Sequence, residues 1–160
     1  MVPVAVRSSI RVVALLLSVF SMSACGAGAV ITGAKDHSIQ TAQPMEPNGL
    51  LDDRVDAEHD PVDWKFFQNE VTDSVFMMFF FDNVGVSADL TLFTGAGNRV
   101  VSVRHDPSAE FDLLQVPDLR EGRYYVKVAI SKGASVYTIR SSTGHMPMLG
   151  GAVNSEPRPE

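Results

Sequence analysis

The chain has 160 residues, a formal net charge of −6 and a single cysteine. This length fits one compact domain with tails. An acidic chain without a lysine and arginine cluster is not expected to bind nucleic acid, or an anionic lipid surface through a basic patch. One cysteine excludes an internal disulfide bond, so we expect the folded core to hold together without one.

The first 24 residues have the order of a secretory signal peptide. Arg7 and Arg11 precede an apolar run, residues 12–20, and small, weakly polar residues follow up to Ala24. The apolar run is shorter than the roughly 20 residues that a transmembrane helix needs. We therefore predict that residues 1–24 are a cleaved signal peptide.

The sequence Met22-Ser23-Ala24-Cys25 resembles the lipobox of bacterial lipoproteins, with Met where Leu is commonest. The resemblance implies cleavage before Cys25 and acyl chains on its sulfur and new amino group. At about 0.8 kcal/mol per buried methylene, such chains hold a protein on the cell envelope almost permanently. Gly26, in place of Asp, favours the outer membrane in a Gram-negative organism. The alternative is an ordinary signal peptide cut near Ala24, which leaves one unpaired thiol.

Residues 25–60 are predicted to form a flexible, lipid-anchored acidic linker. Residues 46–60 contain six acids and one base, Arg54. Such a stretch buries too little apolar surface to offset the entropy of ordering it. A calcium site is the alternative, because hard cations bind several carboxylate oxygens, although the tight spacing around a glycine is missing. At the other end, residues 143–160 are rich in Gly and Pro and predict a disordered tail.

Residues 61–142 are predicted to form an all-β, antiparallel sandwich. Residues 74–81 are continuously apolar and rich in β-forming side chains, which predicts a strand buried on both faces. Later segments alternate between apolar and polar residues, as half-buried strands do, and turns with Gly or Pro separate them. The expected strands are residues 63–67, 74–81, 88–93, 99–104, 110–116, 123–130 and 135–141.

Four segments of this region, in their order along the chain, resemble the bacterial pre-peptidase C-terminal (PPC) domain. They are Asp63-Trp64-Lys65-Phe66-Phe67, Ala88-Asp89-Leu90-Thr91-Leu92-Phe93, Gly122-Arg123-Tyr124-Tyr125-Val126-Lys127-Val128 and Tyr137-Thr138-Ile139. The resemblance implies a jelly-roll-like sandwich of about seven to eight strands. Family members are usually appended to secreted proteases and hydrolases, and some bind collagen or calcium. No peptidase is attached here, so a protease-linked role is not expected.

The candidate metal ligands are Asp63 and Asp89, of which Asp89 matches the strand acid of the PPC pattern. Calcium needs around six oxygens or more, so a solvent-facing or turn-capping role is the alternative for both residues. We predict no cofactor, with calcium as the alternative, and no enzymatic activity. The sequence has no G-x-S-x-G motif, its cysteine is assigned to lipid, and its four histidines lack the close spacing of a zinc site.

Aromatic residues exceed what one core face needs. Neighbouring side chains of a strand point to opposite faces, so one of Phe66 and Phe67, and one of Tyr124 and Tyr125, points away from the core. We expect loops or the linker to cover this face, and the alternative is an exposed aromatic strip that stacks on sugars or docks a protein edge. The candidate ligand-binding residues are Trp64, Phe67 and Tyr125.

These patterns together predict a lipid-anchored envelope protein whose sandwich is a non-catalytic binding module for a surface, glycan or protein ligand. The alternative is an accessory lipoprotein of a secretion or envelope-assembly machine, with one dedicated protein partner. Expected partners are the membrane, through lipidated Cys25, and an envelope protein or glycan.

Overall fold

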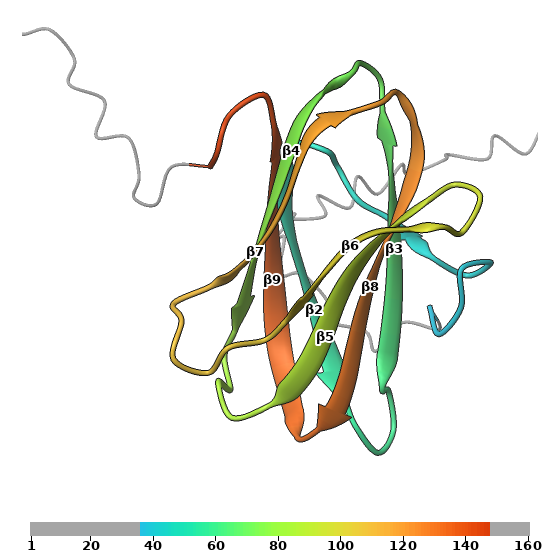
Figure 1. Ribbon diagram of the computed structural model, residues 1–160. Helices are drawn as coiled ribbons and strands as arrows, with labels where there is room; N and C mark the ends of the chain where they lie inside the picture. Colours follow the sequence, from blue (N-terminus) through green and yellow to red (C-terminus); the bar gives the residue numbers. More distant parts are fainter. Residues whose placement is uncertain (1–35, 148–160) are drawn as a thin grey trace, which may run out of the picture.

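A computed structural model describes residues 36–147, which contain nine β-strands and no helix (Figure 1). It follows that nothing in this range is a helix able to cross a membrane. The predicted signal peptide, Cys25 and residues 148–160 of the predicted tail lie outside the described residues.

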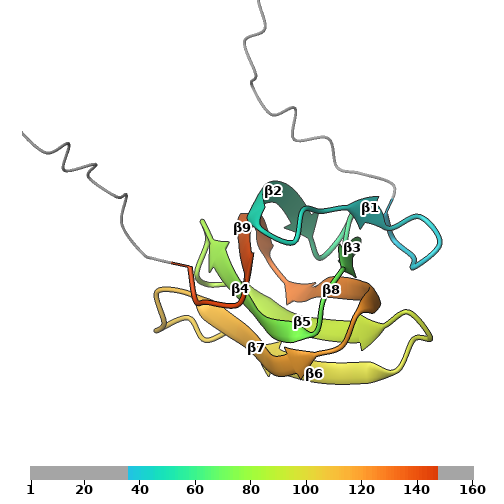
Figure 2. The same ribbon diagram turned by 90° about the horizontal axis from the view of Figure 1, so that it is seen from above.

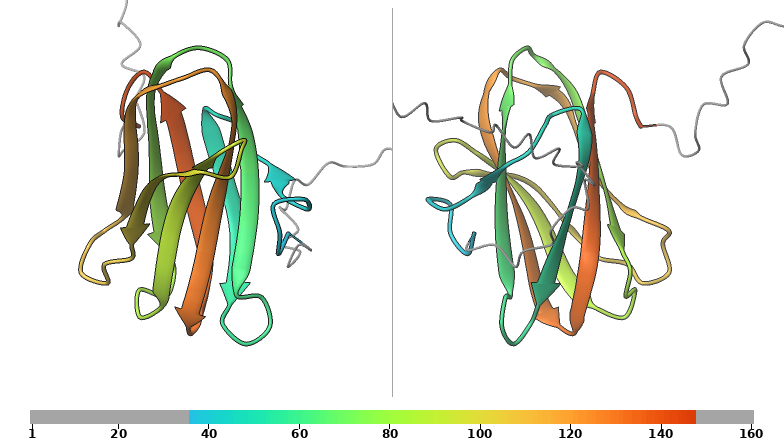
Figure 3. Two further views of the ribbon diagram at one scale, coloured as in Figure 1. Left: turned by 45° about the vertical axis from the view of Figure 1, so that its right-hand side comes forward. Right: turned by 180° about the vertical axis from the view of Figure 1, so that it is seen from behind.

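Two sheets pack face to face as a sandwich (Figures 2 and 3). All strand pairs are antiparallel except the short β1, which lies parallel to β3. The first sheet has the order β1 (Gln43–Pro44), β3 (Val62–Asn69), β8 (Gly122–Lys132), β5 (Ser87–Thr94) and β6 (Arg99–Arg104). The second sheet has the order β2 (Gly49–Asp56), β9 (Ala134–Thr143), β4 (Asp73–Phe81) and β7 (Asp112–Leu119).

The hydrophobic core lies between the sheets and is built from alternate residues of each strand, as the twofold periodicity requires. Strand β4 is the apolar run of the sequence, and its side chain Phe79 is 0% exposed in this core. On the opposite face of β4, Met78 is also fully buried and Phe80 is half-buried against Phe111. The prediction of a strand buried on both faces is therefore confirmed.

All seven predicted strands are present, with ends shifted by a few residues. The predicted turn at Lys132-Gly133 joins β8 to β9. Gly133 has a φ of 82°, and a Cβ atom there would lie 3.3 Å from the Val86 side chain. Both the left-handed backbone and the close approach require glycine at this turn.

Part of the predicted linker belongs to the folded domain, so the prediction of a flexible linker is wrong for residues 49–56. These residues form β2, which pairs with β9 along its whole length. Val55 is fully buried and Asp53 points inward beside it, whereas Asp52 faces outward and accepts a hydrogen bond from Thr138. The described fold therefore begins before residue 61. At the other end, β9 runs to Thr143, the first residue of the predicted tail.

Candidate functional site

The outer face of the five-stranded sheet carries four half-buried aromatic side chains. The strand register places Phe66, Tyr125 and Phe93 in one row across β3, β8 and β5. The rings of Phe66 and Tyr125 lie 6.3 Å apart, and Trp64 lies 5.2 Å from Phe93. We call Trp64, Phe66, Phe93 and Tyr125 the aromatic face.

Two cationic side chains lie over these rings. The Arg123 guanidinium is 4.0 Å from the centre of the Phe66 ring and 5.9 Å from that of Tyr125. The Lys127 ammonium is 5.6 Å from the Trp64 ring. Each such contact is worth about 0.5–1 kcal/mol at an exposed position. Neither cation forms a salt bridge with another residue in the range 36–147, so both charges remain for an anionic ligand.

The structure places two of the three predicted ligand-binding residues, Trp64 and Tyr125, on this face. The third assignment is wrong, because Phe67 points into the core, is 1% exposed and stacks on Tyr124 with ring centres 5.7 Å apart. Phe66 takes the outward position instead. The sequence held the signal for this correction: Trp64 and Phe67 are three positions apart, and residues of one strand share a face only at even spacing.

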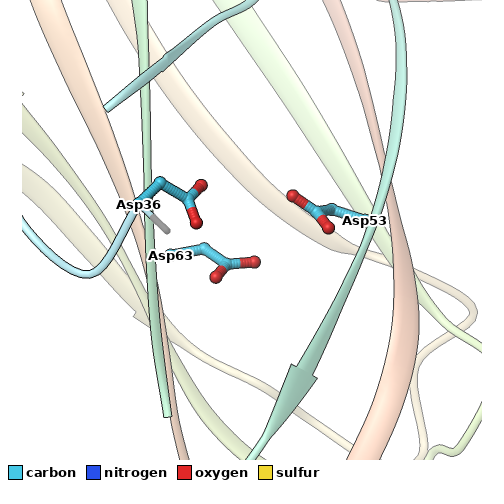
Figure 4. A group of neighbouring side chains, drawn as sticks. All are labelled: Asp36, Asp53 and Asp63. Atoms are coloured by element: carbon cyan, nitrogen blue, oxygen red, sulfur yellow. The ribbon is translucent and has the colours of Figure 1, made fainter. Parts of the chain in front are cut away.

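A buried ionic cluster lies between the two sheets, where Lys65 on β3 of one sheet contacts Asp53 on β2 of the other. Its carboxylates come from Asp36, which precedes β1, from Asp53 on β2 and from Asp63 on β3. One oxygen atom of each lies within 4.8 Å of the others (Figure 4). Lys65, 1% exposed, donates hydrogen bonds to Asp36 Oδ2, at 2.5 Å, and to Asp53 Oδ2. The cluster therefore holds one lysine cation among three carboxyl groups.

Asp63 is the uncharged member of this cluster at neutral pH. Burial raises the pKa of its carboxyl group to about 8, although the Tyr137 hydroxyl, which donates a 2.8 Å hydrogen bond to Oδ2, and the charge of Lys65 both act to lower it. The opposite balance holds for Lys65: burial lowers its pKa, but the hydrogen bonds to Asp36 and Asp53 outweigh burial and raise it. A charged lysine and a protonated Asp63 therefore lie in the same buried space.

We expect the free energy of unfolding to fall as the pH rises from about 4 to about 8. Folded Asp63 keeps its proton until about pH 8, whereas the carboxyl group has an ordinary pKa of 3.8. Unfolding in this window releases a proton, which makes the slope at most about 1.4 kcal/mol per pH unit. Urea titrations of the wild type and of Asp63→Asn check this contribution. It should vanish in the variant, and equal slopes in the two proteins would contradict it.

The two predicted metal ligands do not come together. Asp89 is exposed on the outer face of β5, where its Oδ1 lies 3.1 Å from Arg104 Nε, while Asp63 lies inside the sandwich. Sequence reasoning missed Asp36 and Asp53, because it placed both in the linker. A usable signal was Lys65, which shares the inward face with Phe67 and therefore needs a buried carboxylate partner.

No protein-family model and no curated protein sequence matches the chain. Among solved structures, the pre-peptidase C-terminal domain of a collagenase from Bacillus anthracis aligns with a TM-score of 0.55 and 14% identity, over 62% of this chain and 93% of that one. The Yersinia pseudotuberculosis-derived mitogen gives a TM-score of 0.48 and 15% identity, over 64% and 91%. Aeromonas hydrophila PliG, a periplasmic inhibitor of g-type lysozyme, aligns with a TM-score of 0.42 and 10% identity, over 64% of this chain and 96% of that one. The described part of the chain is an all-β sandwich with a PPC-like fold.

Proposed function

We propose that the protein is a non-catalytic binding module of the cell envelope, held by lipid on Cys25, that binds its ligand on the aromatic face. The observation that carries this proposal is the gathering, on one outer sheet face, of four half-buried rings and two cations that form no salt bridge within the described residues. Clustered apolar surface rimmed by polar groups marks interaction sites, and aromatic residues and arginine are enriched in them.

The chemistry of this face fits an acidic glycan best. Flat rings stack on the apolar faces of sugars, and each ring offers a large rigid surface. The positive charges of Arg123 and Lys127, which no acidic side chain of residues 36–147 neutralises, complement carboxylate or phosphate groups on such a chain. They stand out because the protein as a whole carries a net charge of −6.

Among the described residues, the buried histidine–carboxylate pair favours a non-catalytic role. His105 Nδ1 lies 2.6 Å from Asp112 Oδ2, and Nε2 lies 3.1 Å from the carbonyl oxygen of Val84. Both ring nitrogens of His105 therefore already have a hydrogen-bond partner within the protein, which leaves neither free to reach a proton of a substrate as a general base must.

We expect the double variant Trp64→Ala/Tyr125→Ala to bind an acidic polysaccharide at least about tenfold more weakly than the wild type, because truncation of central aromatic anchors costs roughly 1–2 kcal/mol or more each. Affinity electrophoresis in polygalacturonate measures this effect, with neutral dextran as the uncharged comparison. Arg123→Gln/Lys127→Gln should lose the preference for the charged polymer. Arg104→Gln removes a surface cation that already pairs with Asp89 and is the matched control, with no change expected.

Binding to both polymers that is unaffected by these variants would contradict the glycan assignment. The alternative, an accessory lipoprotein with one dedicated protein partner, is tested by in-cell crosslinking, affinity purification and mass spectrometry. Suppose that one envelope protein is captured in a near-stoichiometric amount and is lost in Trp64→Ala/Tyr125→Ala. The ligand of the aromatic face would then be that protein and not a glycan. A partner retained by that variant would place the binding surface elsewhere.

A further inference from the structure

Lys65 is a buried nucleophile that the aromatic face does not use. Its amine contacts Asp36 and Asp53, and Asp63 completes the same cluster. We propose that Lys65 and Asp53 condense to an intramolecular amide, an isopeptide bond between Nζ and Cγ, which joins the five-stranded sheet covalently to the four-stranded sheet.

Asp53 is the acceptor that the geometry favours over Asp36. Its Oδ2 contacts Lys65 Nζ, while its Oδ1 accepts a 2.8 Å hydrogen bond from the backbone N–H of Arg54. A fixed donor on the oxygen that stays behind stabilises negative charge that develops there during acyl transfer. Asp36 Oδ1, in contrast, is buried and has no hydrogen-bond partner in the described protein.

Both reacting side chains are also held on regular strands. Asp53 lies on β2, which pairs with β9, and Lys65 lies on β3, which pairs with β8. Holding two groups in contact converts an unfavourable bimolecular condensation into an intramolecular one, which removes much of the entropic barrier.

The step balances without an oxidant, a reductant or an activated co-substrate. The Nζ–Cγ bond forms, the Cγ–Oδ2 bond breaks, and one ammonium and one carboxylate become one amide and one water molecule. Asp36, hydrogen-bonded to the amine at 2.5 Å, takes a proton from it so that the nitrogen lone pair can attack. After the attack the nitrogen gives a second proton to Oδ2, and Asp63 supplies the other proton with which that oxygen leaves as water. Asp36 thereby gains the one proton that Asp63 loses, so the two outer carboxyl groups together have no net change.

Asp63 is suited to this role as a positioning acid. It lies two residues before Lys65, on the same inward face of β3, and has one oxygen within 4.8 Å of those of Asp36 and Asp53. Its Oδ2 is held by Tyr137, and its buried Oδ1 has no partner among the described residues. Burial raises its pKa to about 8, so the proton is present at neutral pH.

The amide also removes a costly ion pair from the core. Each buried ion loses several kcal/mol of hydration, which attraction restores only with good geometry. After condensation the ammonium and one carboxylate are replaced by a neutral group. A chain with one cysteine would thereby gain a covalent link between its sheets.

Tryptic peptide mapping of the full-length protein, purified from membranes, tests the proposal directly. Trypsin cuts after Arg54, so Asp53 and Lys65 fall into different peptides unless a side-chain bond joins them. We expect one joined species, uncut after Lys65, whose mass is the sum of the two peptides less one water molecule. Fragmentation then assigns the acceptor among Asp36, Asp52 and Asp53, which share a peptide.

Three variants sharpen this test. Lys65→Arg keeps the positive charge but should give no joined species. Asp63→Asn removes the acid and should slow formation of the joined species at least tenfold after synthesis. Asp52→Asn removes a carboxylate on the outward face of β2 and should change nothing. The wild-type digest decides the question even where a variant fails to fold: separate peptides of full mass, with cleavage after Lys65, would overturn the bond. A link to Asp36 would overturn the choice of Asp53.

Discussion

A Phe79→Asp variant is expected to lose its folded structure at room temperature. Phe79 is fully buried on the inward face of β4, between Ile139 on β9 and Asp112 on β7. Loss of a buried phenylalanine costs about 3–5 kcal/mol, and a new unpaired charge there costs several more. Asp112, directly opposite, adds repulsion between like charges. The total approaches the roughly 5–15 kcal/mol by which domains are stable.

The matched control for this substitution is the neighbouring residue on the same strand. Phe80 is half-buried on the opposite face of β4, with its ring 5.8 Å from that of Phe111. Phe80→Asp should stay folded and lose about 1–2 kcal/mol, since water can reach its charge. Circular dichroism during urea denaturation measures both. Similar unfolding curves for the two variants would contradict the inward placement of Phe79.

Lys65→Ala is expected to lower the free energy of unfolding by about 3–5 kcal/mol, because it leaves the buried carboxyl groups without the lysine that pairs with them and prevents the proposed amide. Lys127→Ala is the matched control: Lys127 belongs to the paired strand of the same sheet, but its ammonium lies on the outer face. That change should cost no more than about 1 kcal/mol. Thermal and urea denaturation compare the two, and equal losses would show that the cluster contributes nothing particular to stability.

Calcium binding provides a second measurement on Lys65→Ala, with the wild type as the comparison. The three carboxylates have oxygen atoms within 4.8 Å of one another, a spacing that an ion with about 2.3–2.6 Å bonds to oxygen can bridge. In the wild type the Lys65 side chain occupies the space between these groups, both as an amine and as the proposed amide. Millimolar calcium should therefore raise the melting temperature of Lys65→Ala and leave the wild type unchanged.

The strands that the sequence predicts are those whose burial can be read from their own side chains. Residues 74–81 are apolar throughout, and the later strands alternate regularly, so no distant partner is needed to recognise them. Strand β2 is different, because its inward residue Asp53 is compatible with a core only when Lys65 from another strand neutralises it. A local sequence pattern describes one strand at a time. It therefore cannot show that a buried charge on one sheet is neutralised by an opposite charge on the other sheet.

The same limit explains the outcome for the candidate site. Trp64 and Tyr125 could be identified because each strand must send alternate residues outward. Whether Phe66 or Phe67 faces outward depends on which alternate residues of the strand point to the core. Lys65 suggests the wrong set, because a lysine is usually exposed and Phe67 shares its face. The burial of Lys65 follows from Asp36 and Asp53, which the alternation of one strand cannot reveal.

The early start of the fold limits how far the module can travel from its anchor. Asp36 is fixed by Lys65 and by the Trp64 N–H, which donates a 2.9 Å hydrogen bond to its carbonyl oxygen. If Cys25 is lipidated as proposed, 11 residue steps (36 − 25) separate the acyl chains from this point. A fully extended chain covers about 3.3–3.6 Å per residue, so the segment between Cys25 and Asp36 can span at most about 40 Å. The first ordered residue of the module would then stay within about 40 Å of the bilayer, and the ligand would have to come within reach of a module held there.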